Sequence, residues 1–206
     1  MKITAKSLNH TNMVFVMPEK ASLTLVPQEV FGHFTSEQTQ GSTYVDDPVM
    51  ELQVFQFPRL QLKVIHDKNR LRLDDSSGSD LSKSLLASEG YRLFQALAKG
   101  KVSDSYGFNY DIMVRSDQVI PQHHILANFL ATNTIDDVAD FGWQFTIRQP
   151  NGKEQKTYFF KVVSPLEIGL HINCHFVGQP ASAASLTEQY IESYDKVDAI
   201  FQQLTF

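Results

Sequence analysis

The sequence predicts an α+β fold, in which a curved antiparallel sheet carries two long helices on one face. Several runs alternate apolar residues with small or polar ones, which is typical of a half-buried strand because successive side chains point to opposite faces. The clearest run is 141–148, which begins with Phe141 and Trp143. Two longer runs, 81–99 and 185–204, carry apolar residues at helical spacing. Because neither a sheet nor an amphipathic helix can bury its apolar face alone, we expect these helices to lie on the sheet.

The first half of the chain contains the signals of several strands and two helices. Pro27 opens a short helix over 27–34, at the first helical position, where proline is tolerated. The polar stretches 35–49 and 74–80 are expected to be connectors. Gly90 costs about 1 kcal/mol relative to alanine and marks the point at which the long helix would break. Strands are expected over 11–17, over 21–26 as an extension or a second strand, over 50–57, and on both sides of a turn at 66–69.

The second half contains the same kinds of element. Asn151 and Gly152 predict a tight hairpin turn, because both residues tolerate positive φ angles. Ser185 is positioned to cap the last helix, with Glu188 completing a capping box. Strands are expected over 106–114, 141–148, 157–163 and 166–176, and a short helix over 121–131.

Both halves therefore follow the order strand, short helix, several strands, long helix, which suggests an internal duplication. The two units are 1–103 and 104–206, joined as one continuous domain. Val26-Pro27-Gln28 in the first unit matches Ile120-Pro121-Gln122 in the second. This order resembles the fold of TATA-binding-protein-like domains, although no sequence motif of that family is present. The resemblance implies one curved sheet with a free face. The alternative is a helix-grip fold, in which a bent sheet wraps one long helix and leaves a cavity.

Composition narrows the class of protein. The 206 residues are 42% hydrophobic and 20% charged, as in an ordinary globular protein. The net charge of −5 argues against nucleic acid or an anionic membrane as the main partner. One cysteine allows no internal disulfide, and no run approaches the ~20 apolar residues that span a bilayer. We expect a cytoplasmic protein with no membrane partner.

The strand at 166–176 carries the first group of candidate binding residues. His171, Asn173 and His175 share its polar face, whereas Cys174 points to the other face. The two histidines lie roughly 13 Å apart at ~3.3 Å per residue, so no metal site and no cofactor are predicted. Asn109 and Asp111 lie on the polar face of 106–114. If the two strands are neighbours on an uncovered sheet face, these five side chains form one binding surface.

A basic hairpin between Arg59 and Arg72 is the strongest local charge signal. Lys63, Arg70 and Arg72 should project from the same side of it. A surface for nucleic acid or phosphate has this pattern. A solvated strand face protected against edge pairing has it too.

No catalytic residue is predicted, because the common motifs of nucleophile, phosphate and metal sites are absent, and an enzymatic role stays open. The first hypothesis is a non-catalytic binding or assembly protein that holds another protein or a second copy of itself through a sheet surface or edge. Fifteen Phe and seven Tyr would supply an exposed aromatic patch. The second is a small-molecule binder or enzyme of helix-grip type, with a pocket between the sheet and the C-terminal helix lined by Trp143, His171, Tyr190 and Tyr194. The third is nucleic-acid or phosphate binding through the Arg59–Arg72 hairpin.

Overall fold

The computed structural model describes residues 2–19, 23, 25–78, 80–127 and 140–203. In this part of the chain the protein is α+β, with one antiparallel sheet of nine strands and four α-helices. The strands are β1 (Ile3–Val16), β2 (Thr43–Asp47), β3 (Leu52–Phe57), β4 (Leu62–Asp67), β5 (Arg70–Asp75), β6 (Ser105–Ser116), β7 (Gly142–Arg148), β8 (Glu154–Ser164) and β9 (Glu167–Val177). The helices are α1 (Pro27–Gly32), α2 (Leu85–Ala98), α3 (Gln122–Ala127) and α4 (Ala183–Gln203).

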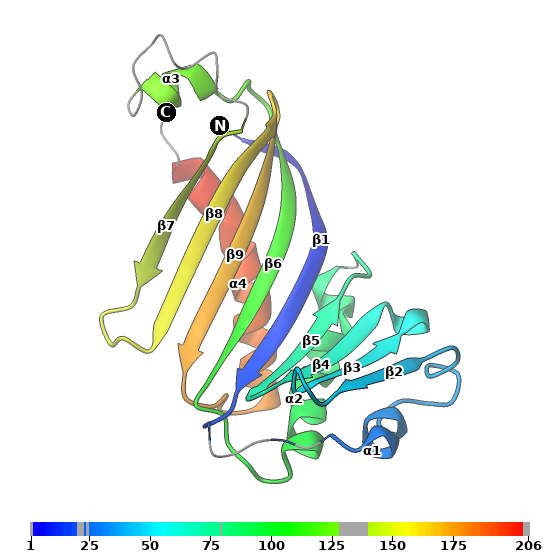
Figure 1. Cartoon of the computed structure of the whole chain (residues 1–206). Coiled ribbons are helices and arrows are strands. Elements are labelled where there is room, and N and C mark those ends of the chain that lie inside the picture. Colours follow the sequence, from blue (N-terminus) through cyan, green and yellow to red (C-terminus); the bar gives the residue numbers. More distant parts are fainter. Residues whose placement is uncertain (1, 20–22, 24, 79, 128–139, 204–206) are drawn as a thin grey trace.

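The strand order places the first strand of the chain in the middle of the sheet. The order is β2-β3-β4-β5-β1-β6-β9-β8-β7, and every neighbouring pair is antiparallel. β6 pairs with β1 along nearly its whole length, whereas β5 pairs only with Thr11–Val16. The strands from β2 to β5 are therefore turned away from the long strands β6 to β9, and the sheet is curved (Figure 1).

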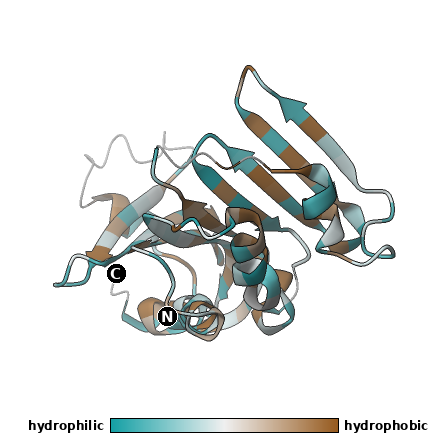
Figure 2. Cartoon of the chain, turned by 90° about the horizontal axis from the view of Figure 1, so that it is seen from below, coloured by the Kyte–Doolittle hydropathy of each residue, from teal (hydrophilic) through white to brown (hydrophobic). Residues whose placement is uncertain are grey.

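The helices α1, α2 and α4 lie on one face of this sheet, which we call the helix face (Figure 2). Aromatic rings fill the space between sheet and helices. Phe15 of β1 stacks on Phe94 of α2 with ring centroids 4.1 Å apart, and Tyr110 of β6 stacks on Tyr190 of α4 at 5.4 Å. All four side chains are buried. The predicted packing of both long helices against the alternating strands is thus observed.

A bulge in β1 explains which of its side chains join this core. The register with β6 shifts between Leu8 and His10. Before the shift, Leu8 lies opposite the buried Ile112 on the helix face, and after it Thr11 lies opposite the buried Tyr110. The extra residue reverses the alternation of the strand, as a bulge does. His10 consequently points to the opposite face.

Several local predictions were wrong. Residues 43–47 form the edge strand β2 rather than a connector, and Asp74 and Asp75 end β5 rather than starting a loop. The first long helix begins at Leu85 rather than at residue 81, and its cap is Ser84, whose hydroxyl accepts from the Leu86 N–H at 3.2 Å. The last helix starts earlier than expected, because Ser182 Oγ, rather than Ser185, caps it by accepting from the Ser185 N–H at 3.1 Å.

Gly90 does not break α2, and its missing side chain has a packing role. A Cβ at this position would lie 2.7 Å from the Sδ of Met13, closer than atoms of these kinds pack. Glycine therefore lets the helix approach β1. The predictions for 21–26, 121–131 and the residues that follow fall partly or wholly outside the described residues. No described helix is both long enough and apolar enough to cross a bilayer.

Replacing Phe94 by alanine should destabilise the protein by about 3–5 kcal/mol, because the side chain is fully buried against Phe15. Urea unfolding followed by circular dichroism measures this change. Gln95→Ala, at an exposed position of the same helix, is the control and should unfold close to the wild-type midpoint. Equal midpoints for the two variants would contradict the packing described here.

Candidate functional site

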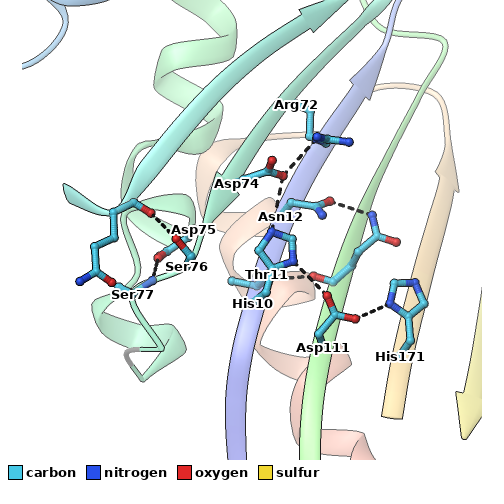
Figure 3. Close-up of polar contacts among 12 residues, drawn as sticks. His10, Thr11, Asn12, Arg72, Asp74, Asp75, Ser76, Ser77, Asp111 and His171 are labelled. Atoms are coloured by element: carbon cyan, nitrogen blue, oxygen red, sulfur yellow. Dashed lines mark hydrogen bonds and ion pairs between the residues drawn. The ribbon is translucent and has the colours of Figure 1, made fainter. Parts of the chain in front are cut away.

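The face of the sheet opposite to α1, α2 and α4, which we call the open face, collects the polar side chains of the central strands. On β1 these are His10 and Asn12, followed by Val14 and Val16, which alternate with the core residues. None of the three helices of the helix face covers them, and Figure 3 shows several of these side chains together. The open face is the part of the described surface where functional groups from distant segments meet.

Three asparagines form a hydrogen-bonded ladder across the middle of the open face. Asn12, Asn109 and Asn173 lie directly opposite one another on β1, β6 and β9. Asn173 Nδ2 donates to Asn109 Oδ1 at 2.6 Å, and Asn109 Nδ2 donates to Asn12 Oδ1 at 2.7 Å. The ladder fixes the rotamers of all three amides, since each links to at least one of the others.

The ladder is the centre of a polar row that crosses the whole sheet. The register places one polar residue of each strand in this row, in the order Thr43, Gln56, Lys63, Asp74, Asn12, Asn109, Asn173, Thr157 and Thr146. A shift of any strand by one residue would send its member to the helix face. The row therefore depends on the register of every strand pair.

A second network of charged groups runs beside the ladder over four strands (Figure 3). Asp111 of β6 bridges two histidines, with Oδ2 at 3.0 Å from His10 Nδ1 and Oδ1 at 2.7 Å from His171 Nδ1. His10 Nε2 lies 3.7 Å from Asp74 Oδ1, and Arg72 Nε pairs with the same oxygen at 3.1 Å. We call these five residues the charge network. It ties β5 and β1 to β6 and β9.

The charge network favours the protonated form of His10. Asp74 raises the pKa of this imidazole, partial burial lowers it, and Asp111 raises it again. The net pKa lies above the ordinary value. A protonated His10 between two carboxylates is thus stabilised by the fold.

A hollow of about 590 Å³ lies on the open face beside the ladder. β1 runs along its middle with Val14 and Val16, between β5 on one side and β6 on the other. Arg70 and Arg72 line the β5 side. The other side is lined by Asn109 and Gly107 of β6 together with Asn173 and His175 of β9. Asp67 of β4, opposite Arg70, lines it as well. The hollow therefore brings cationic groups, a carboxylate, amides and apolar side chains to one place.

The structure brings the predicted candidates onto one face. Asn109 pairs with Asn173, and Asp111 pairs with His171, as expected for neighbouring strands. His175 follows on the same face of β9, and Lys63, Arg70 and Arg72 project to this face from β4 and β5. Whether these residues bind a ligand stays a prediction.

Three further members of this face were not predicted, namely His10, Asn12 and Asp74. The strand was expected to start at Thr11, and Asp74 was assigned to a loop. The sequence did contain a signal for two of them, because the polar residues His10 and Asn12 lie on either side of Thr11, as they would on one face of a strand.

The set of residues suggested for a helix-grip pocket does not share one cavity. His171 lies on the open face, whereas Tyr190 and Tyr194 pack against Tyr110 on the helix face. Trp143 stacks on the buried Phe160 on that same side. The predicted exposed aromatic patch was also wrong, because the rings fill the core. Among the described residues, Phe159 is the one exposed aromatic side chain, at 41%.

The cysteine of β9, Cys174, lies outside the open face. Cys174 is fully buried on the helix face, and this burial raises the pKa of its thiol to about 11. The thiol is therefore protonated at neutral pH. Within the described ranges, no three His, Cys, Asp or Glu side chains are arranged to hold a metal ion.

His10→Gln should lower thermal stability more at acid than at alkaline pH. Because the folded-state pKa of His10 is raised, its stabilising contribution is fully present below the unfolded value of about 6.5 and is lost as the pH rises through the folded value. The measurement is the difference in melting temperature between wild type and variant, followed from acid to alkaline pH. His123→Gln, at an exposed histidine outside the network, is the control. If the difference in melting temperature between wild type and His10→Gln does not shrink as the pH rises, the charge network is contradicted.

Comparison with known protein families and with curated proteins finds no family model and no curated sequence that matches this chain.

Proposed function

We propose that the protein is a non-catalytic binding protein whose binding surface is the open face of the sheet, with the hollow over β1 as its centre. The observation that carries this proposal is the hollow of about 590 Å³, which is lined by two arginines, an aspartate, asparagines and a histidine. Sites for small ligands have volumes of about 300–1,000 Å³ and combine apolar surface with a few oriented polar groups. Val14 and Val16 supply the apolar part.

The polar groups at the hollow are held in place before any ligand arrives. Asn109 is fixed by Asn12 and Asn173, and Arg72 is held by Asp74. Side chains that are already ordered lose less conformational entropy on binding, which favours affinity. The ladder and the charge network join amides, carboxylates, histidines and an arginine, which are groups that hydrogen-bond or pair with a ligand. This composition supports binding rather than nucleophilic catalysis.

We also infer that the fold arose as a duplication of the two units 1–103 and 104–206, in the order of TATA-binding-protein-like domains. The support is the sequence of strands on either side of the β1–β6 pair. It is β5-β4-β3-β2 on one side and β9-β8-β7 on the other. Each unit also ends in a long helix on the helix face. In this arrangement the hollow lies at the boundary of the two units and takes residues from both.

Assembly through a sheet edge is the second candidate. Its support is a small apolar group at the end of the sheet formed by β2. Val45 is 53% exposed, and Val49 and Met50, in the turn that follows, are 89% and 62% exposed. An edge strand with apolar neighbours can pair with a second chain. The chain that pairs with β2 would be another protein or a second copy of this chain.

Filling the hollow should abolish ligand binding. The probe is a library of neutral and charged ring-containing fragments, and binding is followed through the backbone amide resonances of the full chain. Fragments should shift resonances of β1, β5 and β6 in the wild type and not in Val14→Trp. Gln144→Trp, which adds the same ring on the open face of β7, should bind as the wild type does. Fragment shifts confined to other surfaces would contradict the proposal.

If β2 is an assembly edge, light scattering on a size-exclusion column should find a dimer or larger species. Val45→Asp combined with Met50→Asp should convert it to the monomer, because two carboxylates would be buried in the contact. Val119→Asp, at a valine that is 66% exposed elsewhere, should leave it unchanged. A wild-type protein that stays monomeric at high concentration removes this candidate.

A further inference from the structure

We propose that the hollow binds the phosphate group of a small phosphorylated molecule, a site that rests on the binding function proposed above and names its ligand class. The phosphate contacts Arg70 and Arg72 on β5. The remainder of the ligand lies over Val14 and Val16 and reaches the amides of Asn109 and Asn173 on the far side. A nucleoside monophosphate has this combination of an anion and a hydrogen-bonding ring.

The two arginines are suited to one anion. They lie on the same side of β5, two positions apart, which separates their Cα atoms by about 6.6 Å. Arg72 uses Nε for its contact with Asp74, so its terminal nitrogens lie outside that contact. No described side chain forms a hydrogen bond or ion pair with Arg70. Guanidinium groups bind phosphate oxygens in pairs of parallel hydrogen bonds, which makes arginine the preferred residue for this task.

Two carboxylates lie beside the arginines of the hollow. Asp67 lies opposite Arg70 on β4, and Asp74 is already shared between Arg72 and His10. His175 of β9 lines the other side of the hollow. Four further acidic residues lie on the other side of the sheet. On α4, which lies across the helix face, one lysine stands against Glu188, Glu192, Asp195 and Asp198. The carboxylates of Asp67 and Asp74 balance the formal charge of the two arginines, so the proposed affinity for an anion comes from the paired hydrogen bonds that the guanidinium groups can donate.

The size and surroundings of the hollow favour a small ligand over a nucleic-acid strand. A strand needs a track of cations that neutralises successive phosphates. Beyond the hollow, the open face instead carries the carboxylates of Asp111 on β6 and Glu167 on β9. A polyanion that continued along the sheet would meet these groups. The volume of about 590 Å³ fits one small ligand.

The side opposite to the arginines is suited to a polar ring. An asparagine amide carries both a donor and an acceptor, and such a pair matches the edge of a nucleobase. The ladder holds the amides of Asn109 and Asn173 in fixed orientations. Gly107 has no side chain at this point of β6, and a Cβ there would lie 2.4 Å from the carbonyl oxygen of Cys174, so β6 and β9 stay close. The absence of a side chain leaves room over β1.

The test is isothermal titration of the full-length protein with adenosine monophosphate, adenosine and inorganic phosphate. Adenosine monophosphate should bind, and adenosine should bind more weakly by about tenfold or more, because charge-assisted hydrogen bonds to phosphate are lost. Arg70→Gln and Arg72→Gln should each weaken binding of the nucleotide by a similar factor. Lys63→Gln is the matched control, since Lys63 lies on the open face but outside the hollow, and should change affinity by no more than about twofold. Thermal melting establishes that each variant is folded.

The outcomes separate this inference from the binding function. If adenosine binds as tightly as the nucleotide, or if Lys63→Gln has the same effect as Arg70→Gln, the phosphate site is wrong. If none of the three probes binds while neutral fragments still occupy the hollow, the phosphate inference fails and the binding function stands. If nothing occupies the hollow, both fail. A single-stranded oligonucleotide that binds more tightly than the monophosphate, with affinity that falls steeply with salt, would also overturn the small-ligand assignment.

Discussion

The pairing of β1 with β6 is the interaction on which the rest of the structure depends. It joins the strands of the first half of the chain to those of the second, so that one sheet passes through both. Its register sets His10 opposite Asp111 and Asn12 opposite Asn109. Because strand side chains alternate with a period of two, a slip of β6 by one residue would bury Asn109 and Asp111 and expose Phe108 and Tyr110. The desolvation cost of such a slip selects the observed register strongly.

The helix face of the sheet stabilises the fold, and the open face carries the residues proposed for recognition. On the helix face, rings from the strands and from α2 and α4 pack against one another and exclude water. This apolar layer provides the hydrophobic driving force of folding. The open face is consequently free to carry amides and charges, which satisfy one another across strands instead of filling a core. The hollow lies where the curvature of the sheet brings β5 and β9 toward the same space over β1.

Local patterns were sufficient for the elements with strong periodicity. The alternation in β7 and β9 and the apolar stripes of α2 and α4 each identify the buried face of their element. The same alternation placed Asn109 and Asp111 on one side of β6, and His171, Asn173 and His175 on one side of β9. β2 was missed because it is short and contains two aspartates, residues that are more common in turns than in strands. It is a strand because Tyr44 packs on Phe55 and because β3 offers an edge.

The central strand shows why the rest of the site could not be read from local pattern. At the bulge the alternation of β1 changes phase, so a single period cannot describe the strand, and His10 fell outside the predicted element. The partners of His10 depend on strand order, and the sequence contains no local signal that sets β5 and β6 on either side of β1. Asp74 and Asp111 become neighbours of one imidazole only through that order.

The central position of β1 has a consequence for how the chain is made. β5 reaches only Thr11–Val16, and the partner of the remaining edge, β6, begins at Ser105. At roughly 5–20 residues per second, a ribosome needs several seconds to deliver that partner after β1 has emerged. During this interval the nascent polypeptide presents an unpaired strand edge, which other chains can use as a template. The two irregularities in β1, between Ile3 and Ala5 and between Leu8 and His10, interrupt this template, and an irregular edge pairs less readily with another chain.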